Sequence, residues 1–147
     1  MKLIFSLIFI LSLLAACKQS APDVFVADAP ITAETLSNNS ALINAYKNKK
    51  SDIFIEGSGV IKKILPDDNK GSRHQKFLVT INSEQTLLFA HNIDLAPRVE
   101  NLQVNDAITF RGEYVYNPKG GVMHWTHKDR NGGTKAGWIK HNGKTYE

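Results

Sequence analysis

Residues 107–127 carry the pattern that most constrains the fold of this chain. From Ile108 to Tyr116, apolar or small side chains occupy every second position, and mostly polar ones fall between them. A period of two predicts a β-strand with one buried face. Residues 117–121 follow with a proline that fixes φ and two glycines that tolerate positive φ, and residues 122–127 resume the strand pattern. The sequence therefore predicts two strands joined by a tight turn, within a mainly β domain.

Similar alternation appears earlier in the chain, from residue 52. Residues 52–62 are expected to form a first strand that turns Ile53, Ile55, Gly57, Gly59 and Ile61 to one face. Two glycines inside one strand indicate a bulge or sharp coil, as at the corner of a small barrel. Residues 73–81 and 85–91 are expected to form two more strands, whereas residues 92–105 lack alternation. A last short strand is expected at residues 138–141, before the hairpin signal Asn142–Gly143.

The order of these elements resembles an OB-type barrel. Five strands, an irregular connection between the third and fourth, and a glycine-broken first strand together match that architecture. Periodicity by itself supports a small antiparallel barrel or a sandwich. Residues 37–50 predict one helix, because Leu42, Ile43 and Tyr46 form an apolar stripe and lysines gather at its end. We therefore expect a five-stranded antiparallel OB-like barrel preceded by one helix.

The first residues of the chain resemble a bacterial lipoprotein signal. Lys2 precedes an apolar run over residues 3–14, which is too short for a comfortable membrane span of roughly 20 residues. Residues 14–17, Leu-Ala-Ala-Cys, resemble a lipobox, and Cys17 is the one cysteine of the chain. The resemblance implies acylation of Cys17 and a membrane anchor, in place of an unexplained reactive thiol. The alternative is an ordinary cleaved signal in which Cys17 is incidental.

The predicted organisation follows from this anchor. Residues 1–16 are the signal peptide, residues 17–36 are the acylated cysteine and a tether, and residues 37–147 are one domain. Lys18 after the cysteine resembles lipoproteins sent to the outer membrane, facing the periplasm. Removal of residues 1–16 takes away one lysine and leaves 17 Lys and Arg against 14 Asp and Glu, a net charge of +3. Such a charge does not by itself imply a nucleic-acid footprint.

Several segments together resemble a family of small exported bacterial proteins. They are Gly-Glu-Tyr at 112–114, Asn-Pro-Lys-Gly-Gly at 117–121, His-Trp-Thr-His at 124–127, Gly-Trp-Ile at 137–139 and His-Asn-Gly-Lys at 141–144, with further matches at 64–68, 71–77 and 90–98. The resemblance covers about residues 55–146. The family is a domain of unknown function, so it implies a shared module and carries over neither an activity nor catalytic residues.

All five histidines lie in the barrel-like domain, and four of them are expected at one end. Antiparallel pairing across a turn at 82–84 would make His74 and His91 neighbours. His124 and His127 could join them if the strand ends by Thr126, because three-residue spacing on a strand would otherwise separate them. Imidazole is a good ligand for a divalent metal such as zinc, and Asp129 could complete that site. The alternatives are separate histidines with structural contacts, or a ligand site without metal.

Basic and aromatic side chains offer a second type of site. Arg73, Lys76 and Arg111 could hold an anionic ligand such as a nucleic acid or an oligosaccharide, and Trp125 and Trp138 could stack on it. Tyr114 is expected in the core. The same histidines could instead act as a base in phosphodiester hydrolysis. The sequence has no paired-carboxylate motif, nucleophile elbow or phosphate loop.

These observations favour an envelope lipoprotein that binds a ligand or partner at a histidine-rich end of a small barrel. A metal-dependent or histidine-based hydrolase acting on nucleic acid or another phosphodiester is the first alternative. A structural envelope protein is the second. Oligomeric state is left open by the sequence.

Overall fold

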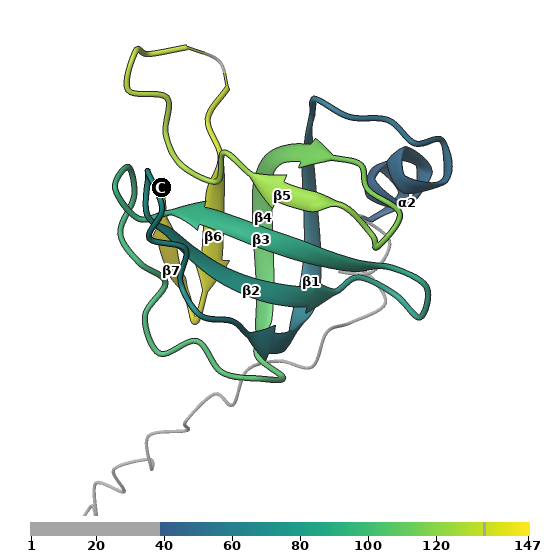
Figure 1. Ribbon diagram of the computed structural model, residues 1–147, viewed down its shortest axis with the longest axis horizontal. Helices are drawn as coiled ribbons and strands as arrows, with labels where there is room; N and C mark the ends of the chain where they lie inside the picture. Colours follow the sequence, from purple (N-terminus) through teal and green to yellow (C-terminus); the bar gives the residue numbers. More distant parts are fainter. Residues whose placement is uncertain (1–38, 134) are drawn as a thin grey trace, which may run out of the picture.

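The computed structural model describes residues 39–133 and 135–147. The predicted signal peptide, Cys17 and the tether to residue 36 lie outside this part of the chain. One helix and seven strands follow in order: α2 (Ser40–Lys47), β1 (Ile53–Ile64), β2 (His74–Thr80), β3 (Thr86–Asn92), β4 (Ala107–Val115), β5 (Val122–His124), β6 (Trp138–His141) and β7 (Lys144–Tyr146) (Figure 1). No helix within the described residues is long and apolar enough to cross a membrane.

Five of the strands close into a barrel. The strand order is β1-β2-β3-β5-β4, and pairing of β1 with β4 completes the ring. This arrangement confirms a small OB-like barrel, but the prediction that it is antiparallel throughout is wrong, because β3 and β5 run parallel. Directions cannot alternate all the way around a closed ring with an odd number of strands. One pair of neighbours must run parallel, and the connection over residues 93–106 assigns that pair to β3 and β5.

The sheet also extends beyond the five strands that the sequence predicts for the barrel. β6 pairs with the first half of β4, and β7 pairs with β6. The Asn142–Gly143 signal is confirmed as the hairpin turn between them, with φ of 47° and 72°. Residues 93–106 contain no helix or strand, so the irregular connection expected between the third and fourth strands is confirmed.

β1 pairs with two neighbouring strands, and two of its glycines allow the close packing that this requires. Its first half pairs with β4 and its second half with β2. A Cβ at Gly57 would lie 2.9 Å from the Phe110 ring, and one at Gly59 would lie 2.6 Å from the Thr80 carbonyl oxygen. Only a residue without a side chain therefore fits at either position, and the register with β2 shifts further along the strand, between Ile61 and Lys63.

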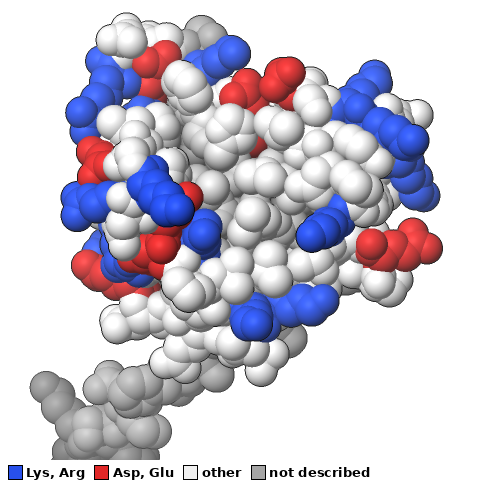
Figure 2. Space-filling view, in the orientation of Figure 1, with Lys and Arg blue, Asp and Glu red and all other residues white. Residues whose placement is uncertain are grey.

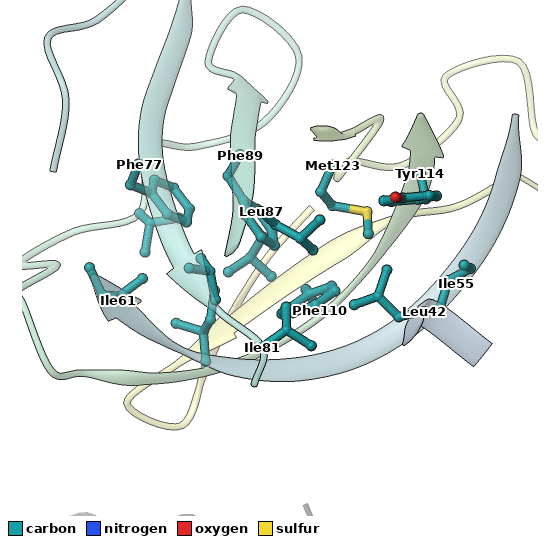
Figure 3. Close-up of a cluster of buried hydrophobic side chains, with 14 of the residues drawn as sticks. Leu42, Ile55, Ile61, Phe77, Ile81, Leu87, Phe89, Phe110, Tyr114 and Met123 are labelled. Carbon is teal, nitrogen blue, oxygen red and sulfur yellow. The ribbon is translucent and has the colours of Figure 1, made fainter. Parts of the chain in front are cut away.

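The inward faces of the strands form one apolar core (Figure 3). Phe77 stacks on Phe89 with ring centroids 5.0 Å apart, and Phe89 meets the edge of Phe110 at 4.8 Å. Tyr114 is fully buried, as predicted. Each such side chain contributes about 1.5–3 kcal/mol by burial. The buried apolar core of the described chain lies within residues 42–146, so a protein that begins at residue 18 retains it.

The helix is shorter than the predicted span of 37–50. Leu42 and Ala45 are buried against the barrel, and Lys47 lies in the last turn. The Asn39 side chain fixes the start of the helix on β1: its amide nitrogen donates to the Ser58 carbonyl at 2.9 Å, and its oxygen accepts from the Ser58 N–H at 2.9 Å.

Candidate functional site

A pocket of about 430 Å³ lies where β2 begins and where β3 and β5 end. The loop that follows β5 stands at this end of the barrel (Figure 1). The pocket is lined by His74, Ala90, Asn92, Leu95, His124, Trp125, His127, Lys128, Asp129, Arg130 and Asn131. Three of the four predicted cluster histidines, together with Trp125 and Asp129, therefore share one concave site.

The strand pairing brings these residues together. His74 opens β2 opposite Asn92, the last residue of β3. β5 is only three residues long and ends at His124, so His127 belongs to a loop and is free of the strand alternation. This was the condition on which the sequence placed both histidines in one cluster, and it is met.

His91 has a structural role beneath the pocket. It is fully buried; Nε2 lies 2.9 Å from the Pro97 carbonyl oxygen and Nδ1 2.8 Å from the Thr126 hydroxyl. A carbonyl can only accept, so Nε2 carries the hydrogen and Nδ1 accepts from the hydroxyl. Burial lowers the pKa of His91, the Pro97 bond opposes this, and His127 and His74 add to the lowering. The ring is therefore neutral and has no nitrogen left for a ligand.

Trp125 has a strained backbone at the rim of the pocket. Its φ is +49°, a left-handed conformation that is unusual for a bulky residue. The indole Nε1–H donates to the Lys135 carbonyl oxygen at 2.9 Å, and the ring stacks on His127 with centroids 5.4 Å apart. Trp125 is 36% exposed, whereas His127 is 6% exposed. One face of the indole is thus covered by imidazole, and the residue keeps a surface for a ligand.

The loop around Trp125 is held by close backbone contacts. The Gly137 N–H donates to the His127 carbonyl oxygen at 2.8 Å. A Cβ at Gly137 would lie 1.9 Å from the Trp125 carbonyl oxygen, so glycine is required for this approach. His127 Nδ1 lies 2.8 Å from the Lys128 carbonyl oxygen and donates to it, which leaves Nε2 as the acceptor nitrogen of the ring.

His124 pairs with an acidic residue of the neighbouring strand. Its register partner on β4 is Glu113, and His124 Nε2 lies 3.5 Å from a Glu113 carboxylate oxygen. The Glu113 side chain is 13% exposed and also lies 3.8 Å from the Lys135 ammonium. A carboxylate at this distance can orient the imidazole ring.

Several residues of the pocket were missed by the sequence reading. Arg130 donates to the Asp94 carbonyl oxygen at 2.9 Å, and Lys128 forms an ion pair of 2.5 Å with Glu147. Asn92 and Asn131 add amide groups to the lining. Three of these four lie in the loop after β5, where no periodicity reveals which way a side chain points. Their position next to residues 124–127 in the sequence was the signal that could have identified the loop residues as part of the pocket.

The predicted anion-binding residues do not join the pocket. Arg73 forms a 2.7 Å ion pair with Asp94, and hydrogen bonds from the Arg73 backbone N–H and then from its guanidinium lower the pKa of that carboxyl. Arg111 lies on β4, 3.5 Å from Glu56, and over the Phe54 ring. Trp138 on β6 is covered by the ammonium of a lysine at 4.7 Å. Lys76 is half-buried on β2, across from Ala90. None of these four residues lines the pocket.

Four of the five predicted metal ligands (His74, His124, His127 and Asp129) line the pocket without forming a coordination sphere, and His91 does not line it. Among residues 39–133 and 135–147, no group of three or more His, Cys, Asp or Glu side chains is placed to hold a metal ion. Zinc requires ligand nitrogens at about 2.0–2.1 Å from one point. His91 uses both nitrogens in hydrogen bonds, and Asp129 accepts from the Asn131 N–H at 2.9 Å. The arrangement of these side chains therefore does not support a preformed zinc site.

The fold and site together define a small OB-like barrel with a histidine-lined pocket at one end. The chain belongs to the family described as "Protein of unknown function (DUF3465)", whose model matches residues 24–147. This match confirms the resemblance to an uncharacterised family. No curated protein matches the chain.

Proposed function

We propose that this chain is a binding module of the bacterial envelope that holds a small anionic ligand in the histidine-lined pocket. The observation that carries the proposal is the left-handed Trp125, which lies at the pocket rim between His124 and His127. The left-handed conformation costs a residue other than glycine about 1–2 kcal/mol of conformational free energy. Such strain persists where surrounding contacts fix it, and it concentrates at ligand-binding sites.

The charge of the lining favours an anion. Lys128 and Arg130 are the cations of the lining and Asp129 is its one carboxylate, but Lys128 is already paired with Glu147 at 2.5 Å. Imidazole and amide groups add hydrogen-bond donors, and the planar guanidinium of arginine suits a phosphate or carboxylate. The Arg130 guanidinium bonds to a backbone carbonyl, so the described contacts leave its charge available for a ligand.

A titration can test this proposal with ethyl phosphate as the probe and a protein that begins at residue 18. We expect calorimetry to detect binding that weakens about tenfold or more in Trp125→Ala and Arg130→Ala. Trp138→Ala is the matched control, because this tryptophan lies on β6 and does not line the pocket. An unaltered affinity in Trp125→Ala and Arg130→Ala, or no binding by the wild type, would contradict the proposal.

The envelope location rests on the leader and lipobox of the sequence, which lie outside the described residues. We propose that Cys17 is acylated and anchors the domain in the membrane, with the outer membrane facing the periplasm as the expected site. Mass spectrometry of the protein purified from a bacterial membrane should find a lipid-modified N-terminal Cys17. An unmodified cysteine, or a mature start at another residue, would contradict the anchor.

Histidine-based phosphodiester hydrolysis is a second candidate, favoured by the pairing of His124 with Glu113. A histidine oriented by a carboxylate can act as a general base, an effect typically of 10²–10⁴-fold. Turnover of bis(p-nitrophenyl) phosphate should then fall by about 100-fold in His124→Gln and less in Glu113→Gln. A wild-type protein without turnover would eliminate this candidate and leave the binding proposal intact.

A further inference from the structure

The outer face of the barrel carries an unexpected apolar row. Leu78, Leu88, Val122 and Val115 lie opposite one another on the neighbouring strands β2, β3, β5 and β4. All four alternate with buried residues and are themselves half-buried, so they face outward. The outward face of a sheet that borders solvent is normally polar. In Figure 2 the middle of this face is largely free of charged side chains, which gather around its margin.

Part of this row lines a groove. It has a volume of about 280 Å³ and is bordered by Leu65, Leu78, Thr86, Leu88, Asn117, Lys119 and Gly121. Leucines provide three of these side chains. The lysine stands at the edge, and a second lysine, Lys62, lies 3.4 Å from the Thr86 hydroxyl. The groove is therefore an apolar slot with basic residues at its rim.

The groove runs toward the histidine-lined pocket along two parallel strands. Leu88 lies opposite Val122, and two residues further along each strand the same face is occupied by Ala90 and His124. Both of these residues line the pocket. One strand repeat of two residues spans about 6.8 Å, and the face from Thr86 to Asn92 spans about 20 Å. Ala90, with its single methyl group, stands at the junction between groove and pocket.

We propose that the pocket and the groove hold one ligand, an amphiphile whose anionic head lies in the pocket and whose linear apolar tail lies along Ala90, Leu88 and Leu78. This inference rests on the proposed anion-binding function and names the class of ligand. Cations and imidazoles meet the head, and leucines meet the tail. A single-stranded nucleic acid fits this face poorly, because Leu78, Leu88 and Val122 offer no ring on which a base can stack.

A chain-length series tests the proposal. Alkyl phosphates from ethyl to decyl are titrated, below the concentrations at which they aggregate, into the protein that begins at residue 18. Each methylene buried in the groove should tighten binding by about fourfold until the groove is filled. Equal affinities across the series would overturn the inference, whereas binding of ethyl phosphate in the pocket would still support the proposed function.

A substitution at the junction separates the two parts of the site. Ala90→Phe should block the path of the tail from the pocket into the groove, so that the affinity no longer depends on chain length. Thr109→Phe is the matched control, because it places the same ring on the outward face of β4 without lining either cavity. An unchanged chain-length dependence in a folded Ala90→Phe protein would overturn the proposal.

Other occupants of the groove give different results. If chain length matters only after residues 18–38 are removed, this chain's own preceding segment fills the groove and the amphiphile proposal is overturned. If decyl phosphate binds equally well to wild type and Trp125→Ala while ethyl phosphate does not bind, the pocket does not hold the head. That result would overturn both the inference and the proposed function.

Discussion

The turn before β5 and the loop after it solve the same backbone problem in different ways. Both contain positive φ, but residues 117–121 have it only at glycines, at 122° and 105°, whereas the following loop has it at Trp125, at 49°, as well as at Gly132, at 71°. In the turn, Gly120 and Gly121 let the backbone lie against Thr86 and the ring of Tyr114. In the loop, the backbone of Trp125 is held in an unfavourable left-handed conformation, and its large ring lies at the surface.

The difference separates architecture from the candidate site. In the turn, positive φ costs little because the residues are glycines, and these residues contact the buried core. The loop keeps its strain and directs Trp125, His127 and Asp129 to a pocket. Substitutions in the turn should therefore reduce stability, and substitutions at Trp125 should reduce binding. Four substitutions test this contrast between turn and loop.

The largest loss of stability is expected from Gly121→Ala. Its Cβ would lie 2.2 Å from the buried Tyr114 ring, at a φ that L-residues avoid. Overpacking and backbone strain together should reduce the free energy of unfolding by about 4 kcal/mol in urea denaturation. Gly132→Ala is the control, because it has positive φ and no atom within 4 Å of the added Cβ, and it should cost about 1 kcal/mol. Equal losses would contradict the packing argument.

His91→Gln should reduce stability by about 2 kcal/mol at pH 7.5, because the ring joins Pro97 to Thr126. The loss should shrink at lower pH. The folded pKa of His91 lies below the unfolded value of about 6.5, so the unfolded state binds more protons between the two values. The stabilisation that His91 gives to the wild-type protein is fully present above about pH 6.5 and decreases as the pH falls toward the folded pKa. A gap between the two unfolding curves that widens with acid would contradict this sign.

Tyr114→Phe should cost about 1 kcal/mol. The hydroxyl donates to the Gly120 carbonyl oxygen at 3.2 Å, and burial raises the pKa of Tyr114 to about 12, so the group stays protonated. The same carbonyl also accepts from the Gln85 amide at 3.0 Å and is not left unsatisfied. Thermal unfolding measures the change. A loss as large as that of Gly121→Ala would mean that the turn depends on the hydroxyl more than on its glycines.

Trp125→Gly should change stability by less than about 1 kcal/mol. Relief of the left-handed strain offsets the lost stacking on His127 and the lost hydrogen bond to Lys135. Binding of ethyl phosphate should nevertheless weaken about tenfold or more. A large loss of stability with unchanged binding would reverse the contrast between turn and loop.

The sequence predicted most of the barrel because alternation reports which side of a strand is buried. Tyr114 was assigned to the core correctly, and Phe110 lies on the same buried face, as the alternation from Ile108 to Tyr116 predicted. The parallel pair of β3 and β5 was missed, because periodicity carries no information about strand direction. The apolar row was also missed: Leu87 and Leu88 are adjacent in sequence, and only the register shows that Leu88 joins other apolar residues outside the barrel.

The site was predicted in part for a related reason. Residues tied to strand ends, such as His74 and His124, could be brought together by counting along strands. His91 was grouped with them, but its partners Pro97 and Thr126 come from irregular segments, so its structural role could not be seen. Arg130 lies in such a segment as well, where sequence spacing does not determine direction.

The two tryptophans allow ligand binding at the pocket to be followed by NMR. Each gives one indole N–H signal in a ¹H–¹⁵N spectrum, and the protein that begins at residue 18 can be titrated with octyl phosphate. The Trp125 signal, at the pocket rim, should shift progressively and saturate, while the Trp138 signal on β6 should stay in place. A fixed Trp125 signal, or equal shifts of both, would contradict a ligand site at this end of the barrel.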